Sequence, residues 1–284
     1  MASEEKTDGA ETPFFTKPLL IIFVTILIDL IGFGIVIPVL PLYSQNEPFM
    51  ASPFEIGLLT SVFSWMQVFF TPVFGQLSDR FGRKPMIFIS LVGSAVGYGV
   101  IGMANSLTLV FVGRIIGGIA GGSISTAQAY IADVTTKENR AKGMGLFGAA
   151  FGIGFILGPA LAGILSKWGI HVPFYFAGAL SLVNAVAVLF ILPESLTEEL
   201  RKRTEATTEK KGRFAAMTEM FRQKDFLVIA IVYFLLIAAF SIMTSALAPV
   251  ASVALSTFMD CSRSALRSSR ASRRSRADDT ALTS

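Results

Sequence analysis

The sequence predicts an all-α membrane protein, a bundle of six transmembrane helices followed by a seventh. Hydrophobic residues make up 52% of the chain and charged residues 15%, whereas soluble domains carry about 25% charged residues. The apolar residues form long uninterrupted blocks, and about 20 apolar residues span a bilayer as a helix. Because a backbone in lipid must satisfy its own hydrogen bonds, only helices and closed barrels span membranes, and blocks without alternation favour helices.

The apolar blocks divide the chain into seven expected spans. The first six, at 18–42, 56–78, 85–104, 107–132, 143–166 and 172–192, would form one bundle over residues 18–192. Residues 1–17 would be a cytoplasmic N-terminus. The charged stretch 193–225 is expected to be a cytoplasmic linker, and the seventh span follows at 226–255.

Basic residues alternate between the loops and predict the orientation of the bundle. The loop after the second span holds Arg80, Arg83 and Lys84, whereas the loop 43–55 has no lysine or arginine. The loop after the fourth span is again basic. We therefore expect a multi-pass protein of the inner or plasma membrane with its N-terminus in the cytoplasm.

The tail at 256–284 breaks this pattern. It is rich in serine and arginine, has no apolar periodicity, and would lie outside the cell if the seventh span crosses. Arginines on the outer side oppose the positive-inside rule, and this composition is typical of disorder. We interpret the tail as disordered, or as the product of a frame error or truncation.

Several classes of function are excluded by what the sequence contains. One cysteine, Cys261, cannot form an internal disulfide, and one histidine, His171, cannot form a histidine-cluster metal site, so no metal is predicted. No phosphate-binding loop of the Gly-Lys-Ser/Thr type occurs, so the sequence gives no sign of direct ATP drive. We predict neither an enzyme nor a cofactor. The arginine-rich tail is weak evidence for nucleic acid, and no such partner is predicted.

Four motifs resemble the major facilitator superfamily, in particular its drug/proton antiporters. The loop Gly75-Gln76-Leu77-Ser78-Asp79-Arg80-Phe81-Gly82-Arg83-Lys84 resembles the signature loop between the second and third helices of that family. The segments beginning at Asp29, Arg114 and Gly154 resemble its first-, fourth- and fifth-helix motifs. Ala129–Asp133 and Pro193-Glu194-Ser195 are similar to the tetracycline-efflux subgroup.

This resemblance implies a proton-coupled antiporter that exports small amphipathic molecules such as tetracycline-like drugs, driven by the proton gradient. Its partners would be a small-molecule substrate and the lipid bilayer. The family has twelve spans in two halves, so a chain with one half and one more helix would need a second half-transporter chain. A non-transporting fragment, a half-length membrane partner protein, and a uniporter or symporter of the same fold are the alternatives.

Two charged residues lie within the expected spans. A carboxylate at the bilayer centre costs about 2.5–3.5 kcal/mol on insertion scales, so Asp29 should face a cavity, pair with a cation or be protonated. Arg114 stays charged and needs a carboxylate or carbonyl partner. The resemblance implies that Asp29 couples proton entry and that Arg114 assists. A packing hydrogen bond for Asp29 and a structural ion pair for Arg114 are the alternatives.

The loop after the second span combines turn-forming glycines with charges that can pair. The resemblance implies that it locks the two halves when the transporter faces outward, whereas anchoring by positive charge is the simpler alternative. The gating residues would be Gly75, Asp79, Arg80, Gly82, Arg83, Lys84 and Asp133.

Small residues recur at helical spacing and predict close helix contacts. In the fifth span, Gly154, Gly158, Pro159 and Gly163 form the antiporter-like motif, to which the resemblance assigns the sealing of a leak path. Gln128 in the fourth span is either a wall of the substrate cavity or a partner in an interhelical hydrogen bond.

Overall fold

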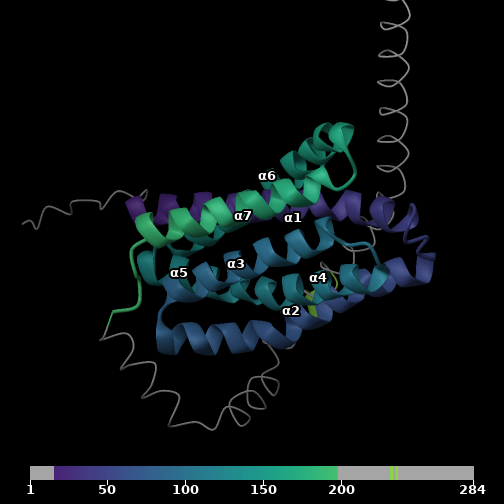
Figure 1. Ribbon diagram of the computed structural model, residues 1–284. Coiled ribbons are helices and arrows are strands. Elements are labelled where there is room, and N and C mark those ends of the chain that lie inside the picture. Colours follow the sequence, from purple (N-terminus) through teal and green to yellow (C-terminus); the bar gives the residue numbers. More distant parts are fainter. Residues whose placement is uncertain (1–15, 198–230, 233–234, 236–284) are drawn as a thin grey trace, which may run out of the picture.

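The computed structural model describes residues 16–197 together with residues 231, 232 and 235. Six long helical segments run side by side and alternate in direction (Figure 1). They comprise α1 (Lys17–Gln45), α2 (Pro53–Phe81), α3 (Arg83–Gly102), α4 (Leu107–Ala120) continued through η1 (Gly121–Ser123) into α5 (Ile124–Val134), α6 (Arg140–Leu165) extended by η2 (Ser166–Trp168), and α7 (Val172–Ile191).

Each of the six segments is long and apolar enough to cross a membrane, which confirms the six-helix bundle predicted from the sequence. Several helices extend beyond the predicted spans because polar residues continue them past the apolar stretch. Thus α1 begins at Lys17, α2 continues through Asp79 to Phe81, and α6 begins at Arg140. A capping box fixes the start of α2, where the Ser52 hydroxyl accepts from the Glu55 N–H and the Glu55 carboxylate accepts from the Ser52 N–H.

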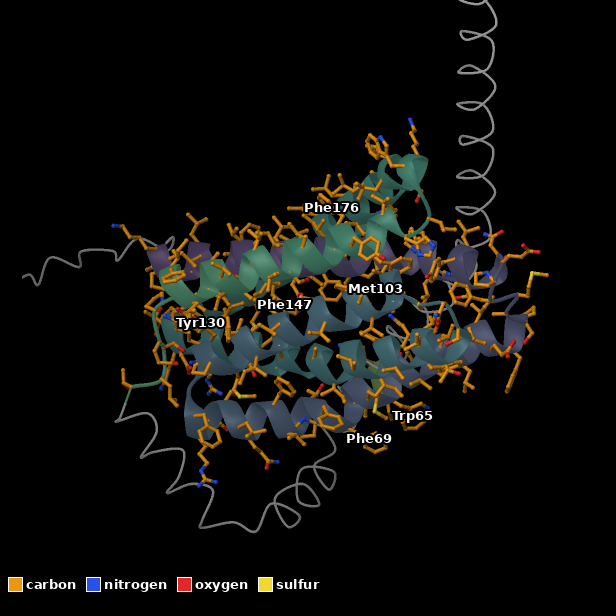
Figure 2. The ribbon with its side chains drawn as sticks, viewed as in Figure 1. Trp65, Phe69, Met103, Tyr130, Phe147 and Phe176 are labelled. Carbon is orange, nitrogen blue, oxygen red and sulfur yellow. The ribbon has the colours of Figure 1, made fainter. Side chains whose placement is uncertain are left out.

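The core consists of two buried clusters, one toward each end of the bundle. One contains Ile22, Leu30 and Tyr130, and the other contains Val36, Tyr43 and Phe174. Figure 2 labels Tyr130, a member of the first cluster, near one end of the bundle. Large apolar side chains also cover the outside of the bundle, where Trp65 and Phe69 of α2 stack at 5.8 Å. Such an apolar exterior is what helices surrounded by lipid require.

The fourth span, predicted at 107–132, runs from Leu107 to Val134, but it is not α-helical throughout. A 3₁₀ turn at Gly121–Ser123 interrupts it. Side chains of neighbouring helices satisfy carbonyl groups at the break: Ser90 of α3 donates to the Ala120 oxygen at 2.8 Å, and Gln67 of α2 donates to the Gly121 oxygen at 3.2 Å. The break therefore brings polar groups into the middle of the bundle.

The seventh predicted span at 226–255 lies outside the described residues, except for 231, 232 and 235, which are helical. The N-terminal segment before residue 16, the linker after residue 197 and the serine/arginine-rich tail at 256–284 also lie outside them.

Candidate functional site

A cavity of about 140 Å³ lies inside the bundle, where the two core clusters meet. All the spans except α7 contribute to its walls. Its polar side chains are Asp29, Gln67, Ser94, Tyr98 and Ser123, and its aromatic ones include Phe33, Phe63, Phe147 and Phe151.

Asp29 is half-buried in the wall of this cavity. Its neighbours Ile26 and Leu30 on α1 are buried in the first core cluster, which fixes the helix face that carries the carboxylate. Among the described residues, no cation lies within ion-pair distance of Asp29. As expected for this residue, Asp29 therefore faces a cavity.

Arg114 lies close to the cavity but not in its wall. Its side chain on α4 is buried, and its Nε donates to the carbonyl oxygen of Leu59 at 3.3 Å. Its guanidinium carbon lies 4.2 Å from the centre of the Phe63 ring. The carbonyl partner expected from the sequence is thus present, together with an aromatic one.

Aromatic rings continue from the cavity across three helices. Phe33 of α1 stacks on Phe63 of α2 at 5.5 Å and meets Phe155 of α6 edge-on at 6.1 Å. On α6, Phe151 stacks on Phe155 at 5.4 Å and lies 5.8 Å from Phe147. This row of rings was not predicted from the sequence, although the spacing of four residues between the α6 phenylalanines places them on one helix face.

Gln128 is exposed on α5 and does not line the cavity. The glutamine in the cavity wall is Gln67, which was not among the predicted site residues. A role for Gln128 in substrate binding stays a prediction.

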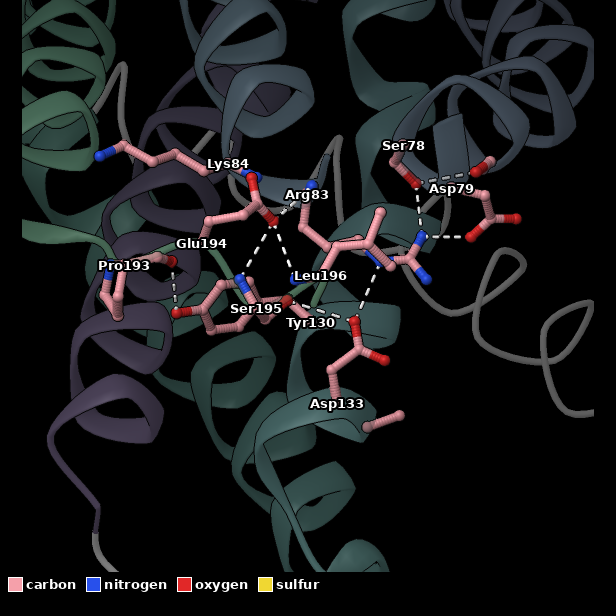
Figure 3. A network of polar contacts seen from close by, with 12 residues as sticks. Ser78, Asp79, Arg83, Lys84, Tyr130, Asp133, Pro193, Glu194, Ser195 and Leu196 are labelled. Carbon is pink, nitrogen blue, oxygen red and sulfur yellow. Dashed lines mark hydrogen bonds and ion pairs between the residues drawn. The ribbon is translucent and has the colours of Figure 1, made fainter. Parts of the chain in front are cut away.

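The second part of the site is a network of charges at one end of the bundle, centred on Arg83 (Figure 3). Arg83 begins α3, and its side chain is only 8% exposed. Its Nη1 lies 2.6 Å from Oδ1 of Asp79 and donates to the Ser78 hydroxyl at 2.7 Å, while its Nε donates to Oδ2 of Asp133 at 3.1 Å. One guanidinium thereby joins the ends of α2, α3 and α5.

Glu194, just after α7, joins the same network and was missed as a site residue. Its Oε1 accepts from the backbone N–H of Arg83 at 2.9 Å, and its Oε2 accepts from that of Lys84 at 3.2 Å. A carboxylate at this place satisfies N–H groups that the first turn of a helix leaves unpaired and interacts favourably with the helix dipole. Ser195 adds a hydrogen bond from its hydroxyl to Asp133 at 3.2 Å.

The remaining residues of the predicted gating loop have different roles. Gly82 links α2 and α3 with a φ of +108°, which favours glycine. In the described part of the chain, Arg80 and Lys84 form no ion pair, and Arg80 instead lies over the ring of Phe81. A Cβ at Gly75 would make an ordinary contact, 3.7 Å from the Ser125 hydroxyl.

The glycines predicted in the fifth span bring α6 against α1, the helix of Asp29. A Cβ at Gly158 would lie 2.5 Å from the carbonyl carbon of Gly34, and one at Gly154 would lie 2.8 Å from Cβ of Leu30. Gly163 is also buried, and Pro159 lies inside α6 without ending it.

Six helices that are long and apolar enough to cross a membrane, packed around a polar and aromatic cavity, define a multi-pass membrane protein. The sequence pattern of the Major Facilitator Superfamily matches residues 22–262. The chain belongs to this superfamily.

Its relatives include proteins that are named for drug resistance. The chain is 38% identical over 186 residues to the tetracycline resistance protein, class C, of Escherichia coli, a match that covers 64% of this chain and 46% of that protein. It is 33% identical to multidrug resistance protein 2 of Bacillus subtilis (strain 168), covering 75% and 53%. The chain thus spans about half the length of these relatives.

A solved structure supports the same fold. The crystal structure of the human organic anion transporter MFSD10 (TETRAN) superposes with a TM-score of 0.58 at 28% identity, over 65% of this chain and 49% of that one.

Proposed function

We propose that this chain provides the N-terminal half of a proton-coupled antiporter that exports small amphipathic molecules such as tetracycline-like drugs. The observation that supports this most directly is Asp29, a carboxylate in a cavity wall with no ion pair to the described residues. An ionised carboxylate inside a membrane is costly, which favours its binding a proton or a cationic group. If both compete for one carboxylate, proton and substrate exclude each other, as antiport requires.

The cavity walls suit an amphipathic substrate. Phe33, Phe63, Phe147 and Phe151 offer apolar surface and aromatic faces, and Gln67 and Tyr98 offer hydrogen-bonding groups. Small-molecule sites typically combine mostly apolar walls with a few placed polar groups. The names of the tetracycline and multidrug resistance relatives agree with such a substrate.

The network around Arg83 would be the gate. We propose that Asp79, Asp133 and Glu194 hold Arg83 while the protein faces outward, and that breaking these contacts lets the end of the bundle open toward the cytoplasm. This assignment places the N-terminus and the network on the cytoplasmic side of the inner or plasma membrane.

Transport across the membrane would require a second six-helix bundle. In transporters built from repeats, the substrate site lies near the bilayer midplane between the repeats, and alternating access rocks one against the other. The second half would come from the rest of a longer protein or from another chain.

Proton release on substrate binding tests the proposal at the part of the site that this chain supplies. Tetracycline, or ethidium as an aromatic cation, is added to the purified chain in weakly buffered detergent solution, and the released protons are followed with a pH dye. Wild type should release protons, Asp29→Asn should release none, and Asp29→Glu, which keeps a carboxyl group, should retain part of the release.

The other outcomes separate the alternatives. Equal release from wild type and Asp29→Asn would exclude Asp29 as the coupling group. Binding without release from wild type would favour a uniporter or symporter. A chain that binds neither compound would be a non-transporting fragment or partner protein.

A further inference from the structure

Phe63 on α2 lies between the sites of the two charged residues that are inside the bundle, Asp29 and Arg114. Its ring lines the cavity into which Asp29 faces, and the guanidinium carbon of Arg114 lies 4.2 Å from the centre of that ring. Arg114 itself does not line the cavity. One aromatic side chain therefore lies at the boundary between the cavity and the arginine.

Arg114 depends on this ring. The residue is only 6% exposed, and its Nε hydrogen bond to the Leu59 oxygen is long, at 3.3 Å. No carboxylate in the described part of the chain lies within ion-pair distance. A desolvated cation over an aromatic face is attracted by the ring quadrupole, so the Phe63 ring is a main partner of this buried charge.

The position of the ring is fixed by its neighbours. Phe33 stacks on it at 5.5 Å with an angle of 27° between the planes. Glycines of the fourth span make room for this part of α2: a Cβ at Gly118 would lie 2.6 Å from the Phe63 carbonyl oxygen, and one at Gly121 would lie 3.5 Å from Cζ of the ring. The ring is held from α1 and from the fourth span.

Asp29 and Arg114 are nevertheless linked through this one ring, which lines the same cavity as Asp29 and lies under the Arg114 guanidinium. Opposite charges within a few ångströms attract each other far more strongly inside a protein than in water. If Arg114 reached Asp29, the resulting ion pair would occupy the carboxylate and oppose the binding of a proton or a cationic substrate.

We propose that Phe63 is a positioning residue whose aromatic face holds Arg114 beside the cavity and out of it, and so keeps the Asp29 carboxylate available. This role rests on the proposed function, in which Asp29 binds proton and substrate in turn. This role predicts that an apolar side chain without a π face cannot replace Phe63, although such a side chain would fill the space.

The test measures the reactivity of Asp29 in the complete chain reconstituted in lipid vesicles. A hydrophobic carbodiimide, which reacts with protonated carboxyl groups, is added at one fixed pH, and the adduct on the peptide that contains Asp29 is followed by mass spectrometry. Phe63→Leu should lower the labelling rate about tenfold, because a nearby cation favours the ionised carboxylate. Phe63→Met, a second apolar replacement, should do the same, whereas Phe63→Tyr should label like wild type.

Two further variants separate this role from a merely structural one. Phe69→Leu makes the same change at an exposed position of the same helix and should leave the rate unchanged. In the double variant Phe63→Leu/Arg114→Gln the competing cation is gone, so labelling should return to the wild-type rate.

Wild-type labelling of Phe63→Leu, slow labelling of Phe63→Tyr, or a double variant as slow as Phe63→Leu would each overturn the proposal. Labelling requires neither substrate nor transport. If the chain failed the proton-release test, the proposed function would be refuted, and the labelling rates would still decide the role of Phe63.

Discussion

Gly82 and Glu194 fit together at the end of the bundle only because position 82 has no side chain. A Cβ there would lie 2.5 Å from Oε2 of Glu194, closer than real Cβ atoms approach other atoms. The carboxylate occupies this space and accepts hydrogen bonds from the first two N–H groups of α3. Gly82 thus leaves room for Glu194, which follows α7 and lies 112 positions later in the sequence.

Gly82→Ala should therefore destabilise the protein for two reasons. The alanine would have to adopt a φ of +108° and would displace Glu194. Backbone strain of this kind costs about 1–3 kcal/mol. The unfolding temperature in detergent micelles, followed by tryptophan fluorescence, should fall.

Gly57→Ala is the matched control, because nothing lies within 4 Å of a Cβ at that helical position. It should leave the unfolding temperature unchanged or raise it, since alanine favours a helix over glycine. Equal effects of the two substitutions would contradict the geometry at Gly82.

Arg83 and Arg80 should differ sharply in their tolerance of lysine. The guanidinium of Arg83 contacts Ser78, Asp79 and Asp133 at once, a geometry that one ammonium group cannot reproduce. Arg83→Lys should lower the free energy of unfolding by about 2 kcal/mol, within the range found when a buried polar network is broken.

Arg80→Lys makes the same change three residues earlier, at an exposed side chain without an ion pair in the described part of the chain. Its effect should stay within about 0.5 kcal/mol. The difference between the two variants, measured side by side by thermal unfolding, isolates the contribution of the network. If the two variants were equally stable, the contacts of Arg83 would contribute nothing to the free energy of unfolding.

The spans could be predicted because lipid imposes a condition that any single segment must meet by itself. Length and apolar composition identify each helix without reference to the others. The charged loop could also be selected, but its pairing could not be derived, because Arg83 meets Asp133 and Glu194 across separations of 50 and 111 residues. Nothing local in the sequence distinguishes Arg83 from Arg80.

The cavity was harder to predict because its walls come from many helices. Asp29 was selected as a lone intramembrane carboxylate, and it does face the cavity. Gln67 was overlooked and Gln128 preferred, since the face that each glutamine presents depends on how α2 and α5 pack. The interruption at Gly121–Ser123 was missed because its residues are as apolar or small as those of a continuous span.

The proposed orientation can be tested with single cysteines in a Cys261→Ser background. Asn105 lies in the turn between α3 and α4, and Lys137 lies in the loop between α5 and α6; both are exposed. The positive-inside rule places the uncharged turn outside and the basic loop in the cytoplasm. A membrane-impermeant maleimide added to intact cells should label Asn105→Cys, and should label Lys137→Cys only after the membrane is opened. The reverse pattern would invert the topology and remove the gate from the cytoplasmic side.

The glycines of α6 divide into two groups that alanine substitution should separate. Gly158 approaches the α1 backbone so closely that a Cβ would lie 2.5 Å from Gly34, with no flexible side chain to move aside. Gly158→Ala should push α6 away from α1 and cost about 1–3 kcal/mol, as overpacking does in well-packed cores. Gly152→Ala on the same helix adds its methyl group where nothing lies within 4 Å, and it should be neutral or slightly stabilising.

Because Asp29 lies on α1, Gly158→Ala should also change the carbodiimide labelling of Asp29, whereas Gly152→Ala should not. If both variants unfolded and labelled like wild type, the close contact between α1 and α6 would not set the geometry of the cavity.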